Sequence, residues 1–193
     1  MSCLSVICIV TLGNHDNKDN FYKAWHMNID DCCTFGTVHE FEHINVIALD
    51  NSSKTKDNGE ITTEHCIWLD KQFQKVKHNG KMTILMMHHP VIFDEHTPMA
   101  IVDYTDEFTK IIRKYEPGMI LCGHTHRRLT TTFENIPYAT SGSLSFQGTT
   151  LRDGSIRFCE DAVMNLINIE DDNISISEIA ILEEKKVLGT IRM

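Results

Sequence analysis

The sequence predicts an α/β fold with a largely parallel sheet, and three observations support this prediction. Between residues 44 and 122, apolar runs of strand length alternate with segments of helical period, as expected for strands joined by crossover helices. After His126 the chain changes to short strand-like runs separated by turns, which indicates an antiparallel part. Three apolar runs also end beside histidines, and ligands bind at the ends of parallel strands. With 193 residues, 41% of them hydrophobic, we expect one domain spanning residues 1–193.

In chain order, the first predicted strand is Val6–Leu12, a continuous apolar run that ends at a glycine. We predict a short helix at Asn20–Met27 and a second strand at Ile44–Leu49. Thr63–Lys77 has apolar residues at helical spacing and a threonine suited to the N-cap, so we predict an amphipathic helix there. Either Gly80 or Asn79 suits the left-handed position that ends such a helix.

The next strand is predicted at Met82–Met87. Tyr104–Tyr115 has apolar residues on one helical face, a proline and a glycine stop this helix, and Met119–Cys122 begins the following strand. The remaining strands are short, and we expect them to pack as part of a second sheet. They are predicted at Thr130–Phe133, Tyr138–Thr140, Ser143–Gln147, Ala162–Ile169 and Ile174–Leu182.

The composition argues against several classes of protein. The net charge of −9 disfavours partners that require a basic face, so we expect neither a nucleic-acid polymer nor a membrane surface as a partner. No apolar run reaches the roughly 18–20 residues of a membrane span, and the N-terminus lacks the basic residues of a signal peptide. The seven cysteines show no disulfide or zinc-binding spacing, so we expect reduced thiols and a cytoplasmic protein.

Three short motifs bring metal-binding residue types to the ends of predicted strands. They are Gly-Asn-His-Asp at Gly13–Asp16, His-His-Pro at His88–Pro90 and Gly-His-Thr-His at Gly123–His126. Each alone has an ordinary explanation, because Asn and Gly form turns and histidines at strand ends are often solvated. Together they predict a metal-dependent hydrolytic site with donors that suit transition metals or zinc better than calcium. In an extended segment His124 and His126 would point the same way, toward one metal cluster.

On these motifs the chain resembles the calcineurin-like metallophosphoesterase superfamily, and within it the class III cyclic-nucleotide phosphodiesterases. Other matching segments are Phe21, Ile47–Asp50, Trp68–Leu69, Met86–Pro90 and Leu121–Arg127. The resemblance implies a metallophosphoesterase-type four-layer α/β/β/α sandwich, N-terminally incomplete and with an antiparallel C-terminal part. It also implies a small phosphodiester substrate, a 3′,5′-cyclic nucleotide in that subfamily.

The resemblance further implies two divalent metal ions, Mn, Fe or Zn, as cofactors. Asn14, His88 and His124 would ligate the second ion, and His126 would ligate the first. In such sites two ions roughly 3.5–4 Å apart hold a hydroxide and the phosphate oxygens for in-line attack.

The other motif residues receive roles through the same resemblance. His15 would protonate the leaving alkoxide, which is typically worth roughly 10²–10⁴-fold in rate, and Asp16 would orient its ring. His89 is expected to be structural or to face the substrate. Arg127, with Arg128 beside it, either contacts the phosphate or is a solvated charge at the start of a strand. The loop Ser141–Ser143 is expected to lie near the pocket.

Upstream of Gly13 the chain departs from the family pattern. Family members carry Asp-x-His and Gly-Asp-x-x-Asp motifs there, whereas the twelve residues before Gly13 contain neither Asp nor His. Three explanations stay open: an incomplete form of an active enzyme, an inactive relative, or a site completed by another chain. Because strand edges would be left uncovered, a homo-oligomer also stays open.

Three functions are consistent with these residues. The first is a phosphodiesterase, which predicts metal-dependent turnover that is lost in His15→Ala. The second is a phosphomonoesterase or protein phosphatase on the same scaffold, which predicts a preference for monoesters. The third is a non-catalytic binding protein, which predicts a purified chain without metal.

Overall fold

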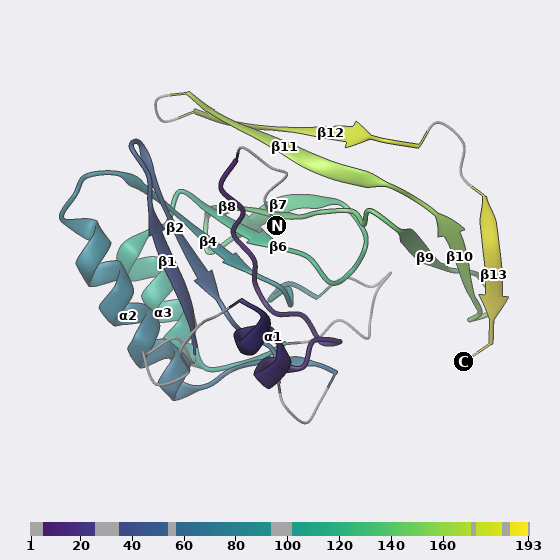
Figure 1. Cartoon of the computed structure of the whole chain (residues 1–193), viewed down its shortest axis with the longest axis horizontal. Helices are drawn as coiled ribbons and strands as arrows, with labels where there is room; N and C mark the ends of the chain where they lie inside the picture. Colours follow the sequence, from purple (N-terminus) through teal and green to yellow (C-terminus); the bar gives the residue numbers. More distant parts are fainter. Residues whose placement is uncertain are drawn as a thin grey trace.

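A six-stranded mixed sheet forms the centre of the molecule in the computed structural model, which describes residues 6–25, 35–53, 57–93, 102–170, 173–182 and 186–192 (Figure 1). Its four inner strands are parallel, and an antiparallel strand closes each edge. From edge to edge the strands are β1 (Gly36–Glu40), β2 (Ile44–Leu49), β4 (Met82–Met87), β6 (Met119–Cys122), β8 (Ile136–Thr140) and β7 (Leu129–Phe133). The predicted α/β fold is therefore confirmed.

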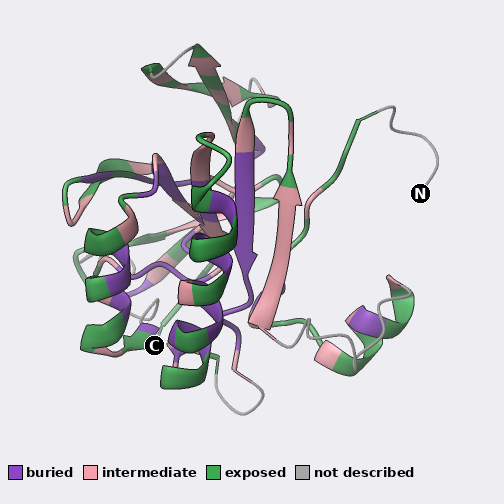
Figure 2. Ribbon diagram, turned by 90° about the vertical axis from the view of Figure 1, so that its left-hand side faces the viewer, coloured by how far each residue is buried: buried purple, intermediate pink, exposed green. Residues whose placement is uncertain are grey.

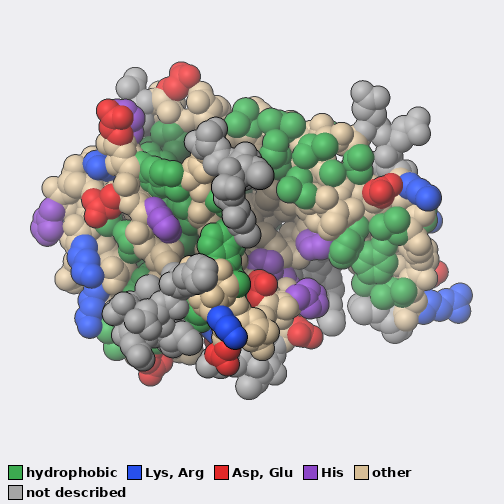
Figure 3. Space-filling view, in the orientation of Figure 1, with side chains coloured by type: hydrophobic (Ala, Val, Ile, Leu, Met, Phe, Trp, Pro, Cys, Tyr) green, Lys and Arg blue, Asp and Glu red, His purple; other side chains and the backbone are tan. Residues whose placement is uncertain are grey.

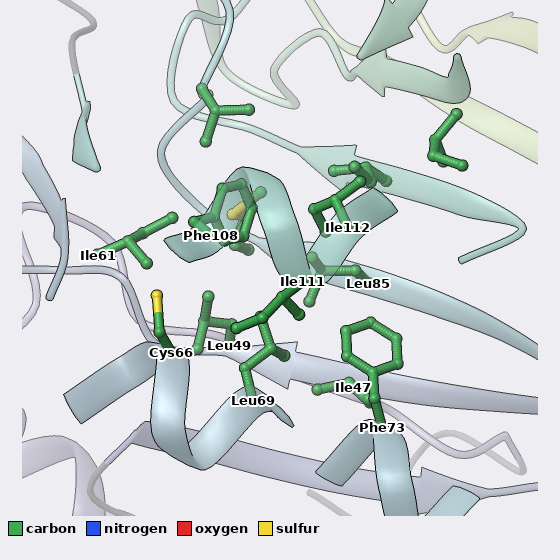
Figure 4. Close-up of a cluster of buried hydrophobic side chains, with 14 of the residues drawn as sticks. Ile47, Leu49, Ile61, Cys66, Leu69, Phe73, Leu85, Phe108, Ile111 and Ile112 are labelled. Carbon is green, nitrogen blue, oxygen red and sulfur yellow. The ribbon is translucent and has the colours of Figure 1, made fainter. Parts of the chain in front are cut away.

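Two helices cover one face of this sheet, α2 (Thr63–Lys77) and α3 (Asp106–Tyr115) (Figures 1 and 2). Figure 2 shows the sides of both helices that face the sheet as buried and their outer sides as exposed. In the core between the layers, Leu69 and Phe73 of α2 lie near Leu85 of β4, and all three are at most 2% exposed (Figure 4). The helical period of the sequence thus buries one face of each helix.

The opposite face of the sheet is covered by a hairpin of β11 (Val163–Glu170) and β12 (Asn173–Ala180) (Figure 1). Alternate residues of the hairpin face the sheet, as a period of two requires. The packed residues are Ile167, Ile169, Ile174 and Ile176 of the hairpin and Val46, Ile84, Met119 and Ala139 of the sheet. The described residues therefore form three layers: helices, sheet and hairpin.

The prediction that the short strands after His126 pack in a second sheet is wrong for β7 and β8, which lie in the main sheet with β8 parallel to β6. A second, antiparallel sheet does form in the C-terminal part. It consists of β9 (Phe146–Thr150), β10 (Ile156–Glu160) and β13 (Val187–Ile191), with β10 in the middle. A short parallel pair, β3 (Gly59–Ile61) and β5 (Val102–Tyr104), lies outside both sheets. Because Tyr104 belongs to β5, the helix predicted from Tyr104 begins only at Asp106.

The strand predicted at Val6–Leu12 is wrong, because these residues pair with no strand among those described. Both edges of β2 are already occupied by β1 and β4, and the segment runs away beside them (Figure 2). Ile9 packs against the sheet on the hairpin side, while Val6 and Ile7 are exposed. The segment nevertheless leads into a helix near the predicted place, α1 (Lys18–Ala24).

The helix predicted at Asn20–Met27 corresponds to α1, which begins two residues earlier; Met27 lies outside the described residues. The strand predicted at Ser143–Gln147 corresponds to β9, which starts later, at Phe146. Among the helices that the structure describes, none is long and apolar enough to cross a membrane.

Candidate metal centre

The carboxyl ends of β2, β4 and β6 lie side by side at the same end of the main sheet, because these strands run parallel. His88 follows β4 and Gly123 follows β6, and the Gly123 N–H donates to the His88 carbonyl oxygen at 2.9 Å. This bond joins the two histidine-bearing loops. Figure 3 shows histidine side chains gathered beside a hollow in this face of the molecule.

Asn14, His88 and His124 bring three donor atoms to one point. The Asn14 Oδ1, His88 Nε2 and His124 Nδ1 atoms lie 3.2 Å from one another along each side of a triangle. Donors bound to one zinc-sized ion at about 2.0–2.1 Å are themselves roughly 3.0–3.4 Å apart. The three donors therefore have the spacing that a single divalent ion requires.

The electrostatic state of both histidines also fits metal binding. Burial, followed by the neighbouring histidines, lowers the pKa of His88 to about 3 and the pKa of His124 to about 4. His15 and His126 are among the neighbours that lower both pKa values. Both rings are thus neutral near pH 7, and the neutral imidazole is the form that ligates a metal.

The first motif forms a tight loop beside this triangle. The Asp16 carboxylate accepts a hydrogen bond from the Gly13 N–H at 2.7 Å, and in the described structure no hydrogen bond joins it to the His15 ring. His15 is exposed. A Cβ atom at Gly13 would lie only 3.0 Å from Cε1 of His88, so glycine lets the loop approach the histidine ring.

The third motif is a turn and not the extended segment that the sequence suggested. His124 and His126 both have left-handed backbone angles, with φ of 67° and 54°, and the Thr125 N–H donates to the Gly123 carbonyl oxygen. His126 therefore does not join the triangle. Its Nδ1 lies 2.8 Å from the carbonyl oxygen of Phe146, whose ring packs against the imidazole at a centroid distance of 4.5 Å.

His89 is fully buried and its Nε2 donates to the carbonyl oxygen of Asp57 at 3.1 Å. One nitrogen each of His88, His89 and His124 lie within 4.8 Å of one another. Arg127 is held through its backbone, since its carbonyl oxygen accepts from Thr140 Oγ1 at 2.6 Å.

The predicted proximity of the Ser141–Ser143 loop also has a structural counterpart. The Ser141 N–H donates to the carbonyl oxygen of Cys122, directly before the Gly123–His126 turn.

Sequence reasoning missed the residues that surround the cluster. Asp50 and Asn51, directly after β2, are at most 4% exposed and contact the first motif's helix and the backbone of His89. Their position directly after a predicted strand could have indicated a role in the site, but neither residue belongs to one of the three histidine motifs. Phe146, from the second sheet, had no signal in the sequence.

Comparisons with known proteins agree with this geometry. A match to the calcineurin-like phosphoesterase family covers residues 3–128. A probable glycerophosphodiester phosphodiesterase of Arcobacter nitrofigilis is 33% identical over 150 residues, covering 75% of this chain and 54% of that protein. A probable cyclic nucleotide phosphodiesterase of Synechococcus is 29% identical over 137 residues, covering 67% of this chain and 51% of that protein.

The chain thus spans about half the length of the curated relatives that it matches. In its fold it is similar to a dimetal phosphatase of Danio rerio, with a TM-score of 0.50, 13% identity and coverage of 89% of this chain and 71% of that one. Because the family match includes all three histidine motifs, the chain belongs to the calcineurin-like phosphoesterase family.

Proposed function

We propose that this chain carries the active site of a metal-dependent phosphodiesterase for small phosphodiesters, with 3′,5′-cyclic nucleotides as the substrate class. The observation that carries the proposal is the triangle of Asn14, His88 and His124 donors with 3.2 Å sides. The names of the relatives support a phosphodiester substrate. The net charge of −9 makes a bound cation the natural source of attraction for a phosphate.

The three donors of the triangle would hold one divalent ion, which supplies Lewis-acid charge to the phosphodiester and its attacking water. All three donors are neutral, so they leave the charge of the ion available to the phosphate. His126 would serve a second ion, as the family resemblance implies. Mn, Fe or Zn would suit these donors.

The proton for the leaving group would come from His15. It follows Asn14 directly and is exposed, so its ring can reach a phosphodiester held at the triangle. Asp16 closes the loop on Gly13 and thereby fixes where His15 leaves the backbone. We propose a structural role for the buried His89 and a phosphate contact for Arg127. The free thiols of Cys66 and Cys122 support a reducing, cytoplasmic setting.

The test is hydrolysis of bis(p-nitrophenyl) phosphate by the chelated chain, with and without added Mn²⁺. We expect Mn²⁺-dependent turnover that falls roughly 10²–10⁴-fold in His15→Ala. His43→Ala, which removes an exposed histidine at the β1–β2 turn, is the matched control and should retain full activity.

Two further substrates sharpen the assignment. Faster hydrolysis of 3′,5′-cyclic AMP than of p-nitrophenyl phosphate supports the phosphodiesterase. Faster hydrolysis of the monoester would assign a phosphomonoesterase instead. No turnover of any substrate by folded, metal-loaded chain would contradict the proposed function.

A further inference from the structure

The loop that carries Asn14 is fastened to the sheet by side chains. We call residues 6–17 the N-terminal arm; none of its described residues pairs in a strand. Before Asn14, Thr11 Oγ1 donates to the Leu49 carbonyl oxygen at 3.1 Å. After Asn14, Lys18 Nζ lies 3.0 Å from Asp50 Oδ2. Both fastenings therefore reach the end of β2.

Of these two contacts, the ion pair between Lys18 and Asp50 is the stronger. The Asp50 side chain is 5% exposed, and Oδ1 accepts hydrogen bonds from the N–H and Oγ of Ser52 at 3.0 and 2.6 Å. Oδ2 receives Lys18 and the hydroxyl of Tyr22, one turn further along α1. A helix of seven residues is marginal by itself, so its position depends on such contacts.

Asn51 performs a similar task for His88. It is fully buried, its Nδ2 donates to the His89 carbonyl oxygen at 2.9 Å, and its Oδ1 accepts from the His89 N–H at 3.1 Å. One amide side chain thus satisfies both backbone groups of the residue after His88. Without it, two buried backbone groups would lose their partners.

We propose that Asp50 and Asn51 are positioning residues that hold Asn14 and His88 at the spacing needed for a metal ion. The inference rests on the proposed function, because it takes these donors to be metal ligands. Neither residue touches the ion; Asp50 acts through Lys18 and α1, and Asn51 acts through the His89 backbone. Residues that orient metal ligands typically change metal affinity by roughly 10–100-fold when they are replaced.

The experiment is a titration of the chelator-treated 193-residue chain with Co²⁺, followed by visible absorption, for the wild type, Lys18→Met and Asp50→Asn. Positioning predicts that both substitutions raise the Kd for Co²⁺ by roughly tenfold or more. A purely electrostatic effect would act in opposite directions, because removing the lysine charge favours cation binding and removing the aspartate charge opposes it. A tighter or unchanged Kd in Lys18→Met would therefore overturn the role of Asp50.

A matched pair tests Asn51. Asn45 is equally buried at the other end of β2, where its side chain pairs with Asn79 and Thr83, roughly 20 Å from Asn51 along the strand. Asn51→Leu and Asn45→Leu should both lower the free energy of unfolding measured in chelator. We expect only Asn51→Leu to raise the Kd for Co²⁺.

Equal Kd values in the two leucine variants would overturn the role of Asn51. If Asn51→Leu does not fold, Asn51→Ser replaces it and the same comparison applies. A wild-type chain that binds no Co²⁺ at all would contradict the proposed function itself, which separates that failure from a failure of positioning.

Discussion

The main sheet and the N-terminal arm contribute to the same site by different means. His88 and His124 follow parallel strands whose register is set by backbone ladders and a packed core. Asn14 lies on an arm without ladder pairing, held by the side-chain contacts of Thr11 and Lys18. Two donors are therefore placed by the fold and the third by a few polar contacts. We expect Asn14 to be the first of the three donors to move when contacts are removed.

The largest expected effect contrasts the core with the arm. Phe108 of α3 is fully buried, so Phe108→Ala should lower the free energy of unfolding by about 3–5 kcal/mol. Val10 is 37% exposed, and Val10→Ala should change the free energy of unfolding by less than about 0.5 kcal/mol. Urea denaturation of both variants measures this difference, and similar losses would show that the arm is as well packed as the sheet.

A second pair of variants separates the glycines on the two sides of the site. In Gly13→Ala the new methyl group would lie 3.0 Å from the His88 ring and should push the arm away. Overpacking typically costs about 1–3 kcal/mol, so we expect metal binding to weaken by roughly 5–150-fold. In Gly123→Ala the nearest atom lies at 3.7 Å, an ordinary contact. Calorimetric titration with Zn²⁺ should therefore find weaker binding only in Gly13→Ala, and equal affinities would contradict the arm's close approach.

The pH dependence of the free energy of unfolding should depend on histidines of the sheet and its helices, and not on the N-terminal arm. Burial lowers the pKa of His65, whose Nδ1 accepts from the Thr62 N–H at the start of α2 and whose Nε2 donates to the backbone carbonyl oxygen of Asp50. Below the ordinary pKa of 6.5 the unfolded chain binds more protons than the folded chain, so stability falls as the pH decreases.

The half-buried His88 and His124 and the buried His89 add to this loss with the same sign, because their pKa values are also lowered. His65→Gln keeps an acceptor for the Thr62 N–H but cannot titrate, so the fall in unfolding free energy between pH 7 and pH 5 should be smaller than in the wild type. An identical pH profile would mean that His65 is not neutral in the folded chain.

The smallest expected effect concerns Thr11. Thr11→Val removes the hydrogen bond to Leu49 and keeps the shape of the side chain, which should cost about 0.5–1.5 kcal/mol. We expect its metal affinity to fall less than that of Lys18→Met, because the buried ion pair on the other side of Asn14 is intact. If Thr11→Val loses more metal affinity than Lys18→Met, the Thr11 hydrogen bond is the more important of the two contacts that hold the arm.

Secondary structure was predictable from the sequence where the apolar residues follow one clear period and the element has a neighbour to pack against. The strands at Ile44–Leu49, Met82–Met87 and Met119–Cys122 and the helix at Thr63–Lys77 have the predicted bounds. Val6–Leu12 has the same apolar character, but a strand also requires a free edge, and no local pattern shows that β1 and β4 occupy both edges of β2.

The site was predictable to a similar degree. The order of the histidine motifs brings Asn14, His88 and His124 together, because strand ends converge in a parallel sheet. The direction of His126 was not predictable, because it depends on two left-handed residues and on Phe146 of a distant strand. The contacts of Asp50 and Asn51 are likewise long-range and leave no periodic signal.

A crystal structure of the chain soaked in Zn²⁺, with the ion located by its anomalous scattering, tests whether Asn14, His88 and His124 bind one metal ion. We expect one ion within about 2.0–2.2 Å of Asn14 Oδ1, His88 Nε2 and His124 Nδ1. An ion bound to other residues only, or no ion at these three donors in a saturated crystal, would contradict this expectation.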